Sequence, residues 1–144
     1  MLKKTLLQLL SMRILVTGSE GFLGKVLCRQ LRKDSHEVIG YDIANGSDIL
    51  DSIQLRTAMA DCDVCIHLAA IADLYIAEHQ PELARNLNIN ATKSLIEIAE
   101  QLDVRVLFAS TVCAYGNNGV AVCVEESPLA PTEVYAESKA EAEQ

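Results

Sequence analysis

Short apolar runs alternate with amphipathic helical segments along almost the whole chain, and this alternation limits the fold more than any other feature. The runs expected to form strands lie at residues 13–17, 36–42, 63–69 and 104–109, with a brief further piece at 48–50. The segments expected to form helices lie at 22–32, 52–60, 81–102 and 135–144. Buried strands that alternate with helices form a parallel sheet covered on both faces. We therefore predict an α/β fold, a Rossmann-like doubly wound parallel sheet of about five strands in the order 3-2-1-4-5.

A glycine-rich turn joins the first strand to the first helix. Residues 17–24 read TGSEGFLG and place Gly18, Gly21 and Gly24 in this turn. Glycine permits the tight turn, the approach of the backbone to a pyrophosphate and the close packing of helix on strand. Amide N–H groups at the start of the helix can then bind phosphates. The spacing is G-x-x-G-x-x-G rather than G-x-G-x-x-G, so a purely structural turn stays open beside dinucleotide binding.

A carboxylate at the end of the second strand is the next cofactor feature. Asp42 lies where an acidic side chain can accept hydrogen bonds from both ribose hydroxyls of an adenosine. It would repel a 2′-phosphate, and Ile43 and Ala44 supply no compensating arginine. The predicted cofactor is therefore NAD, preferred over NADP. An exposed aspartate with no ligand is the alternative interpretation.

The charge balance restricts the partners. The chain has 12 Lys and Arg against 20 Asp and Glu, a formal net charge of −8. Nucleic acids and anionic membranes are bound through basic patches, so neither is an expected partner. The apolar runs also stop short of the roughly 18 residues that a membrane-spanning helix needs.

The cysteines indicate a reducing compartment. Five cysteines cannot all pair within one chain, and the Cys62-x-x-Cys65 motif falls in an apolar strand, where a structural role is favoured over a redox or zinc site. We predict no metal site and a cytoplasmic location. Residues 1–11 are predicted to be an N-terminal extension, and Met12 is an alternative start. The dinucleotide-binding domain is assigned to residues 12–144.

In the first helical segment, Leu23, Val26, Leu27 and Leu31 recur at helical spacing. This periodicity predicts that they form the face buried against the sheet.

A series of motifs follows in order along residues 12–144: TGSEGFLG at 17–24, YD at 41–42, SDILD at 47–51, HLAA at 67–70, Asn90, FASTVCAYG at 108–116 and EESPLAPTEVYAESK at 125–139. With these motifs the chain resembles the N-terminal part of the NAD-dependent epimerase/dehydratase family, the extended short-chain dehydrogenases/reductases. This resemblance implies an oxidoreductase-type enzyme that acts on a nucleotide-sugar or a related small molecule. Members of this family usually form homodimers, and we expect a homodimer here.

The resemblance implies a cofactor role for further residues. Phe22 and Leu23 would line the pyrophosphate turn, and Asp48 and Ile49 would contact the adenine. A third group, Leu68, Ala69 and Ala70, would line the path past the ribose toward the nicotinamide. Asn90 would lie near the same cofactor. His67 is assigned to the strand framework, without a catalytic role.

The catalytic group implied by the resemblance is Thr111, Tyr135 and Lys139. Tyr135 and Lys139 form Y-x-x-x-K, so their side chains share one face of a helix. A lysine ammonium near the phenol is expected to lower the Tyr135 pKa, so that Tyr135 acts as general base while hydride passes to the nicotinamide. Thr111 would hydrogen bond the reacting oxygen, and Lys139 would also hold the nicotinamide ribose.

Two departures from the family pattern bear on this assignment. Counted from Asn90, an N-x-x-G-T stretch has Lys93 and Ser94 in place of glycine and threonine. Val112 and Cys113 stand where sugar 4,6-dehydratases carry an Asp-Glu pair, which argues against that branch.

The sequence ends soon after Lys139, and family members continue for about the same length again. We therefore expect that the remaining strands and a smaller substrate domain are absent from this chain. Two other interpretations stay open: a dinucleotide-binding module without enzymatic activity, and an inactive truncated remnant.

Overall fold

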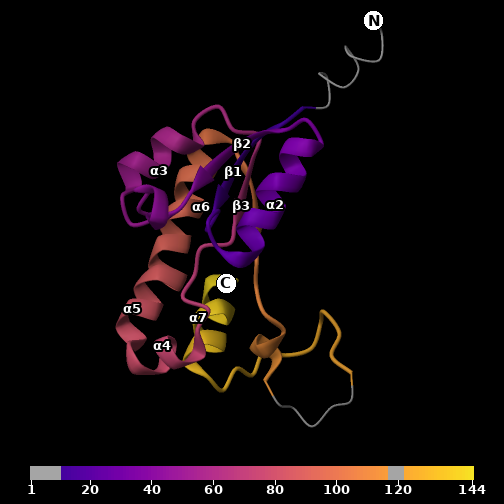
Figure 1. Ribbon diagram of the computed structural model, residues 1–144. Helices are drawn as coiled ribbons and strands as arrows, with labels where there is room; N and C mark the ends of the chain where they lie inside the picture. The colour runs from indigo at the N-terminus through magenta and orange to yellow at the C-terminus, as the bar shows by residue number, and fades with distance from the viewer. Residues whose placement is uncertain (1–10, 117–121) are drawn as a thin grey trace, which may run out of the picture. The chain divides into compact units, whose positions relative to one another are not determined.

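The computed structural model describes residues 11–116 and 122–144 (Figure 1). The predicted extension, apart from Ser11, and residues 117–121 therefore lie outside the described residues. The chain divides into two compact units. The first comprises Met1–Ala69 and Ser94–Ala109, and the second comprises Ala70–Lys93 and Ser110–Gln144.

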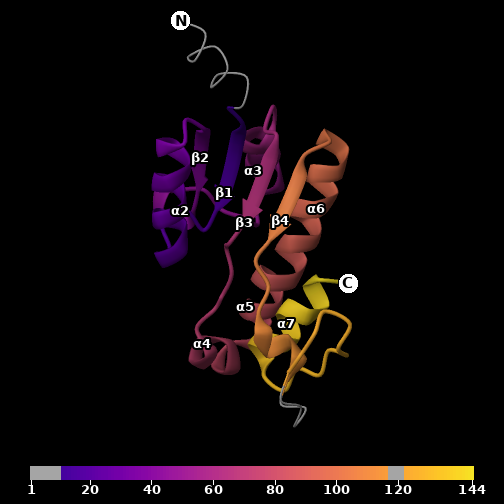
Figure 2. The ribbon, with the colours of Figure 1, turned by 90° about the vertical axis from the view of Figure 1, so that its right-hand side faces the viewer.

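The first unit is built on a parallel sheet of four strands. These are β1 (Arg13–Thr17), β2 (Glu37–Tyr41), β3 (Val64–His67) and β4 (Arg105–Phe108), in the order β2-β1-β3-β4 (Figure 2). Leu15 of β1 lies opposite Ile39 on one side and Cys65 on the other. The predicted parallel, Rossmann-like α/β fold is confirmed.

The predicted strand at residues 48–50 is wrong, so the described sheet has four strands rather than five. This segment forms a turn because its polar groups bind locally. The Tyr41 hydroxyl donates to the Asp48 carbonyl oxygen at 2.7 Å, and the Asp48 amide donates to Gln54 Oε1 at 2.9 Å. Asp51 then caps the next helix by accepting from the amides of Ile53 and Gln54. The segment closes on itself and pairs with no strand of the sheet.

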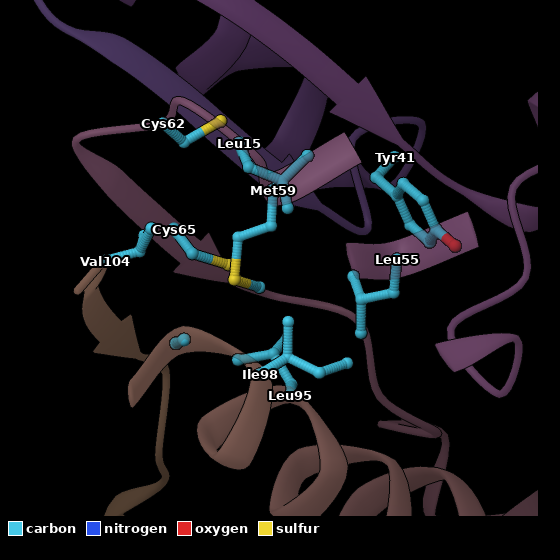
Figure 3. Packing of buried hydrophobic residues seen from close by; sticks show 10 residues of the cluster. Leu15, Tyr41, Leu55, Met59, Cys62, Cys65, Leu95, Ile98 and Val104 are labelled. Carbon is cyan, nitrogen blue, oxygen red and sulfur yellow. The ribbon is translucent and has the colours of Figure 1, made fainter. Parts of the chain in front are cut away.

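Helices cover both faces of this sheet. Leu27 and Leu31 of α2 (Phe22–Lys33) pack on the face that presents Ile14 and Val16. On the opposite face, α3 (Ser52–Met59) and α6 (Ala91–Leu102) enclose the larger apolar cluster (Figure 3). Its buried members are Leu15, Tyr41, Leu55, Met59, Cys62, Cys65, Leu95, Ile98, Ala99 and Val104.

The predicted buried face of α2 is only half right. Leu27 and Leu31 pack on the sheet, but Leu23 and Val26 are 65% and 57% exposed. The residues that α2 buries fully are Gly24 and Cys28. Gly24 brings the start of α2 close to the turn that precedes it, and this contact turns Leu23 and Val26 toward solvent.

The second unit is mostly helical. It contains α4 (Leu74–His79), α5 (Pro81–Arg85), the π-helical segment η2 (Asn86–Asn90), the 3-10 helix η3 (Val112–Tyr115) and α7 (Val134–Ala142). The long helix predicted from Pro81 to Leu102 is present, interrupted by η2, whereas α4 was not predicted. Small buried residues allow these short helices to pack closely; they are Ala77, Ala84, Ala114, Ala136 and Ala140.

The five cysteines are all free. Cys62 and Cys65 lie in the apolar cluster, which favours the structural interpretation of this pair. None of the described helices has both the length and the apolar character needed to cross a bilayer.

Candidate cofactor and catalytic site

The glycine turn closes tightly against the ends of β1 and β3. Gly18 has φ +68°, and a Cβ atom there would lie 2.8 Å from the Ala69 amide nitrogen. A Cβ atom on Gly24 would lie 2.1 Å from the Gly18 carbonyl oxygen. No side chain caps α2 at Gly21, so the amide N–H groups of the first turn, which includes Phe22 and Leu23, are left for another acceptor. The turn is therefore a cradle of backbone donors suited to a pyrophosphate.

Asp42 is fixed beside this cradle. Its Oδ2 accepts from the Glu20 amide at 2.9 Å, and its Oδ1 accepts from the Ala44 amide at 2.9 Å. The second contact caps the short 3-10 helix η1 (Ile43–Asn45). An ionised carboxylate has about four acceptor positions, so two positions remain for the hydroxyls of a ribose. The fixed orientation suits the predicted role of Asp42.

The turn that follows η1 contains Asp48 and Ile49. Tyr41 anchors this turn, and burial together with the nearby carboxylates of Asp51 and Asp48 raises the Tyr41 pKa to about 12. The Asp48 side chain accepts from the Leu50 amide at 2.9 Å, and Ile49 packs partly against the large apolar cluster. Their predicted contact with adenine stays a prediction.

A buried network at the end of β3 holds Leu68 and Ala69. Their amides both donate to Thr17 Oγ1 at 3.2 Å. Because Oγ1 accepts these two bonds, its own proton is directed to His67 Nδ1, which lies 2.7 Å away. His67 therefore acts as a hydrogen-bond acceptor within the framework at the ends of β1 and β3.

In the second unit, Thr111 and Tyr135 come together. Thr111 precedes η3, and its Oγ1 accepts from the Cys113 amide at 3.2 Å. Tyr135 lies in the first turn of α7 and is half-buried. The Thr111 hydroxyl lies near enough to the Tyr135 phenol to lower the pKa of Tyr135 through hydrogen bonding. The structure thus brings together two residues that lie far apart in the sequence, and their catalytic roles stay predictions.

Lys139 lies one turn further along α7 and is only 3% exposed. Burial lowers the Lys139 pKa to about 8, and the Glu143 carboxylate opposes this shift. Glu143 also accepts a short hydrogen bond from the Ser110 hydroxyl. Ser110 precedes Thr111, so this bond ties the end of α7 to the segment that carries Thr111.

The predicted lowering of the Tyr135 pKa is not found. Burial raises this pKa, electrostatic interaction with the nearby Cys113 raises it further, and only the Thr111 hydrogen bond lowers it. Burial therefore outweighs any effect of the lysine charge on the phenol. In the free protein the phenol is neutral at pH 7, which suits Tyr135 as a proton donor.

Asn90 and Ala70 are less constrained. Asn90 is exposed and donates to Asn86 Oδ1 at 3.2 Å, and Ala70 is half-buried at a bend. Their cofactor roles stay predictions.

The sequence interpretation missed Asn88, which is buried. Its Oδ1 accepts from the Ile71 amide at 2.8 Å, and its Nδ2 donates to the Ile71 carbonyl and to Ser138 Oγ. Thr92 Oγ1 donates to the Asn88 carbonyl at 2.7 Å. Counted from Asn88 rather than Asn90, the N-x-x-G-T stretch keeps its threonine and has Ala91 for glycine. This register could have been found from the sequence.

The burial of Lys139 predicts a stability cost that depends on pH. Its pKa is about 8 in the folded chain and 10.5 when exposed, so the unfolded chain binds more protons between these values. The penalty, at most about 3 kcal/mol, is complete below pH 8 and is relieved as the pH rises through 10.5. We expect Lys139→Met to raise the free energy of unfolding at pH 7 and to lose this gain above pH 10.5, measured by urea denaturation.

Lys93 is the matched control for this prediction. It is exposed and pairs with Glu141 at 3.6 Å, and such pairs contribute less than about 1 kcal/mol. Lys93→Met is therefore expected to change stability little at either pH. Equal effects of the two substitutions would contradict the buried-lysine interpretation.

The fold is that of a Rossmann-like α/β protein, with a glycine-rich turn in one unit and Thr111, Tyr135 and Lys139 in the other. The model of the NAD dependent epimerase/dehydratase family matches residues 14–144. The chain belongs to this family.

Several of the relatives have names that refer to nucleotide-sugars, and others include a 3-beta-hydroxysteroid dehydrogenase of Mycolicibacterium neoaurum, 29% identical over 91% of this chain and 41% of its own length. The dTDP-4-dehydrorhamnose reductase of Mycolicibacterium smegmatis is 27% identical over 99% of this chain and 43% of its own length. The UDP-Glc/GlcNAc 4-epimerase of Campylobacter jejuni matches with a TM-score of 0.84 and 28% identity, over 92% of this chain and 47% of its own. MoeE5, solved with UDP-glucose and NAD, matches with a TM-score of 0.83 and 29% identity, over 91% and 46%. This chain thus spans less than half the length of these relatives.

Proposed function

We propose that this chain is the cofactor-binding half of an NAD-dependent oxidoreductase that acts on a nucleotide-sugar by epimerisation, dehydration or reduction. The observation that carries the proposal is the pairing of Thr111 with Tyr135 beside the buried Lys139 on one helix. A module that only binds a dinucleotide needs no such proton-transfer group. Three relatives whose names or bound ligands are UDP- or dTDP-sugars support the substrate class.

The first unit would bind the adenosine and pyrophosphate parts of NAD. The cradle between Gly18 and Gly24 would hold the pyrophosphate, and Asp42 would accept the ribose hydroxyls. The Asp42 carboxylate would repel a 2′-phosphate, which supports a preference for NAD over NADP. The bound dinucleotide supplies the hydride acceptor for the reaction.

The second unit would carry out the proton transfer of the reaction. In the oxidation direction, the tyrosinate form of Tyr135 would take the proton of a substrate hydroxyl, while the hydrogen on the same carbon would pass as hydride to the dinucleotide, so that a carbonyl forms. In the reverse direction, the neutral phenol that burial favours gives its proton to the carbonyl oxygen. Thr111 hydrogen bonds this oxygen, and the charge of Lys139 favours the tyrosinate when it forms.

Calorimetry of NAD binding to the full protein tests the cofactor part of the proposal. We expect saturable NAD binding that is tighter than NADP binding and at least about tenfold weaker in Asp42→Ala, because two charge-assisted hydrogen bonds to the ribose are lost. Turnover is then tested with a panel of UDP- and dTDP-hexoses by following NADH absorbance or sugar epimerisation. A folded protein that binds neither dinucleotide would overturn the proposal.

Asp51→Ala provides the matched control for the Asp42 variant. Both aspartates accept hydrogen bonds from two backbone amides, and Asp51 caps α3. The control therefore loses a cap of similar strength, about 1 kcal/mol, without touching the expected ribose contacts. We expect Asp51→Ala to keep the wild-type NAD affinity. Equal loss of affinity in the two variants would assign the Asp42 effect to folding.

A further inference from the structure

Helix α2 carries a concentrated positive charge that the proposed function does not use. Four of the 12 Lys and Arg residues of the chain lie on this one helix, whose sequence FLGKVLCRQLRK contains no acidic residue. They are Lys25, Arg29, Arg32 and Lys33. The chain has a net charge of −8, so this positive cluster has the opposite sign to the chain as a whole and needs a physical explanation.

The four cations line a single cavity of about 510 Å³. Ser19, Glu20 and Cys28 complete its lining. Glu20 pairs with Lys25 at 3.6 Å, whereas no ion pair is found for the other three cations among the residues that the structure describes. The Arg32 charge and the Glu20 carboxylate both act on the pKa of the Cys28 thiol, which burial raises. Charged groups from the turn and from the helix therefore converge on this cavity.

Ser19 gives an independent indication of a missing partner. The residue is only 3% exposed, and its hydroxyl oxygen has no hydrogen-bond partner among the described residues. The hydroxyl lies over Gly40, where a Cβ atom would be 2.8 Å away. A buried hydroxyl without a partner costs about 1–3 kcal/mol and calls for an explanation. Rotation about the Cα–Cβ bond of Ser19 moves this hydroxyl between staggered positions.

We propose that this cavity, lined by Ser19 and the cations of α2, binds the phosphate group of a small molecule. Arginine guanidinium groups match phosphate oxygens with two parallel hydrogen bonds, so Arg29 and Arg32 supply the specific contacts. Lys25 and Lys33 add charge, and the Ser19 hydroxyl gains an acceptor. The overall negative charge disfavours a long polyanion, whereas a small anion responds to charges within a Debye length of about 10 Å.

Titration with inorganic phosphate, followed by ¹H–¹⁵N NMR of the full protein without dinucleotide, tests this proposal. We expect saturable shifts of the amides of Ser19, Arg29 and Arg32, and weaker binding at higher ionic strength. The double variant Arg29→Gln, Arg32→Gln should raise the Kd at least about tenfold, because charge-assisted hydrogen bonds are lost. Arg105→Gln, which changes an exposed arginine on β4, should leave the Kd unchanged.

Ser19→Ala is a second variant that leaves all four cations in place. We expect it to weaken phosphate binding severalfold, since one hydrogen bond to the phosphate is lost. Circular dichroism spectra of all variants check that they are folded. Absence of saturable shifts, or an unchanged Kd in the folded double variant, would overturn the proposal.

Repeating the titration with bound NAD and with bound NADP identifies the source of the phosphate. Phosphate binding that persists with both dinucleotides assigns the cavity to a separate phosphorylated metabolite. Displacement by NADP but not by NAD assigns it to the 2′-phosphate of the dinucleotide. Displacement by both NAD and NADP would place the phosphate in the glycine cradle and would overturn the proposal of a separate phosphate site. The titration without dinucleotide stays informative even if the proposed NAD binding fails.

Discussion

Replacing Tyr135 by phenylalanine is expected to lower kcat about a thousandfold on the nucleotide-sugar that supports turnover, because the reaction loses its proton-transfer group. The phenolic hydroxyl is the only part removed, and it is the group whose pKa the Thr111 hydroxyl lowers. The aromatic ring stays in the first turn of α7, so packing changes little. The loss should therefore appear in kcat, measured by steady-state kinetics, while NAD affinity measured by calorimetry stays close to that of the wild type.

Tyr75 offers the matched control. It is an exposed tyrosine on α4 that stacks on His79 at 3.9 Å between ring centroids, and it has no part in the proposed chemistry. Tyr75→Phe removes the same hydroxyl group and should leave kcat unchanged. If Tyr135→Phe kept more than about a tenth of wild-type kcat, Tyr135 would not be the proton-transfer residue.

Features encoded in neighbouring residues were predictable from the sequence. The glycine turn, Asp42 and the strand–helix alternation depend on local backbone geometry and on short-range periodicity. The structure places Asp42 beside Glu20 of this turn, linked by a hydrogen bond. The pairing of Tyr135 with Thr111 needed the resemblance to a family, because no local rule brings together two residues so far apart.

The errors arise where tertiary contacts override local patterns. Residues 48–50 have the apolar character of a short strand, but Tyr41 and Gln54 bind this segment into a turn. Periodicity cannot show that α2 comes close to the preceding turn at Gly24. The sequence therefore predicted that Leu23 is buried, whereas it is exposed. The Tyr135 pKa depends on burial, which a sequence does not give.

Gly24→Ala is expected to destabilise the first unit and to weaken NAD binding. The new methyl group would lie 2.1 Å from the Gly18 carbonyl oxygen and 2.8 Å from the Ser19 Cα atom. Both neighbours are backbone atoms, so relief requires movement of the turn or of the helix. Overpacking of this kind costs about 1–3 kcal/mol or more, partly offset by up to about 1 kcal/mol from the better helix propensity of alanine.

We expect the free energy of unfolding of Gly24→Ala to fall by about 2 kcal/mol, measured by urea denaturation. Any displacement that relieves the clash moves the amides that would bind the pyrophosphate, so NAD affinity measured by calorimetry should fall as well. Cys28→Ala separates the two effects, because it removes a buried side chain from the same helix at a cost of about 1–2 kcal/mol without touching the turn. If Cys28→Ala weakened NAD binding as much as Gly24→Ala, the loss would come from destabilised α2 packing rather than from the cradle itself.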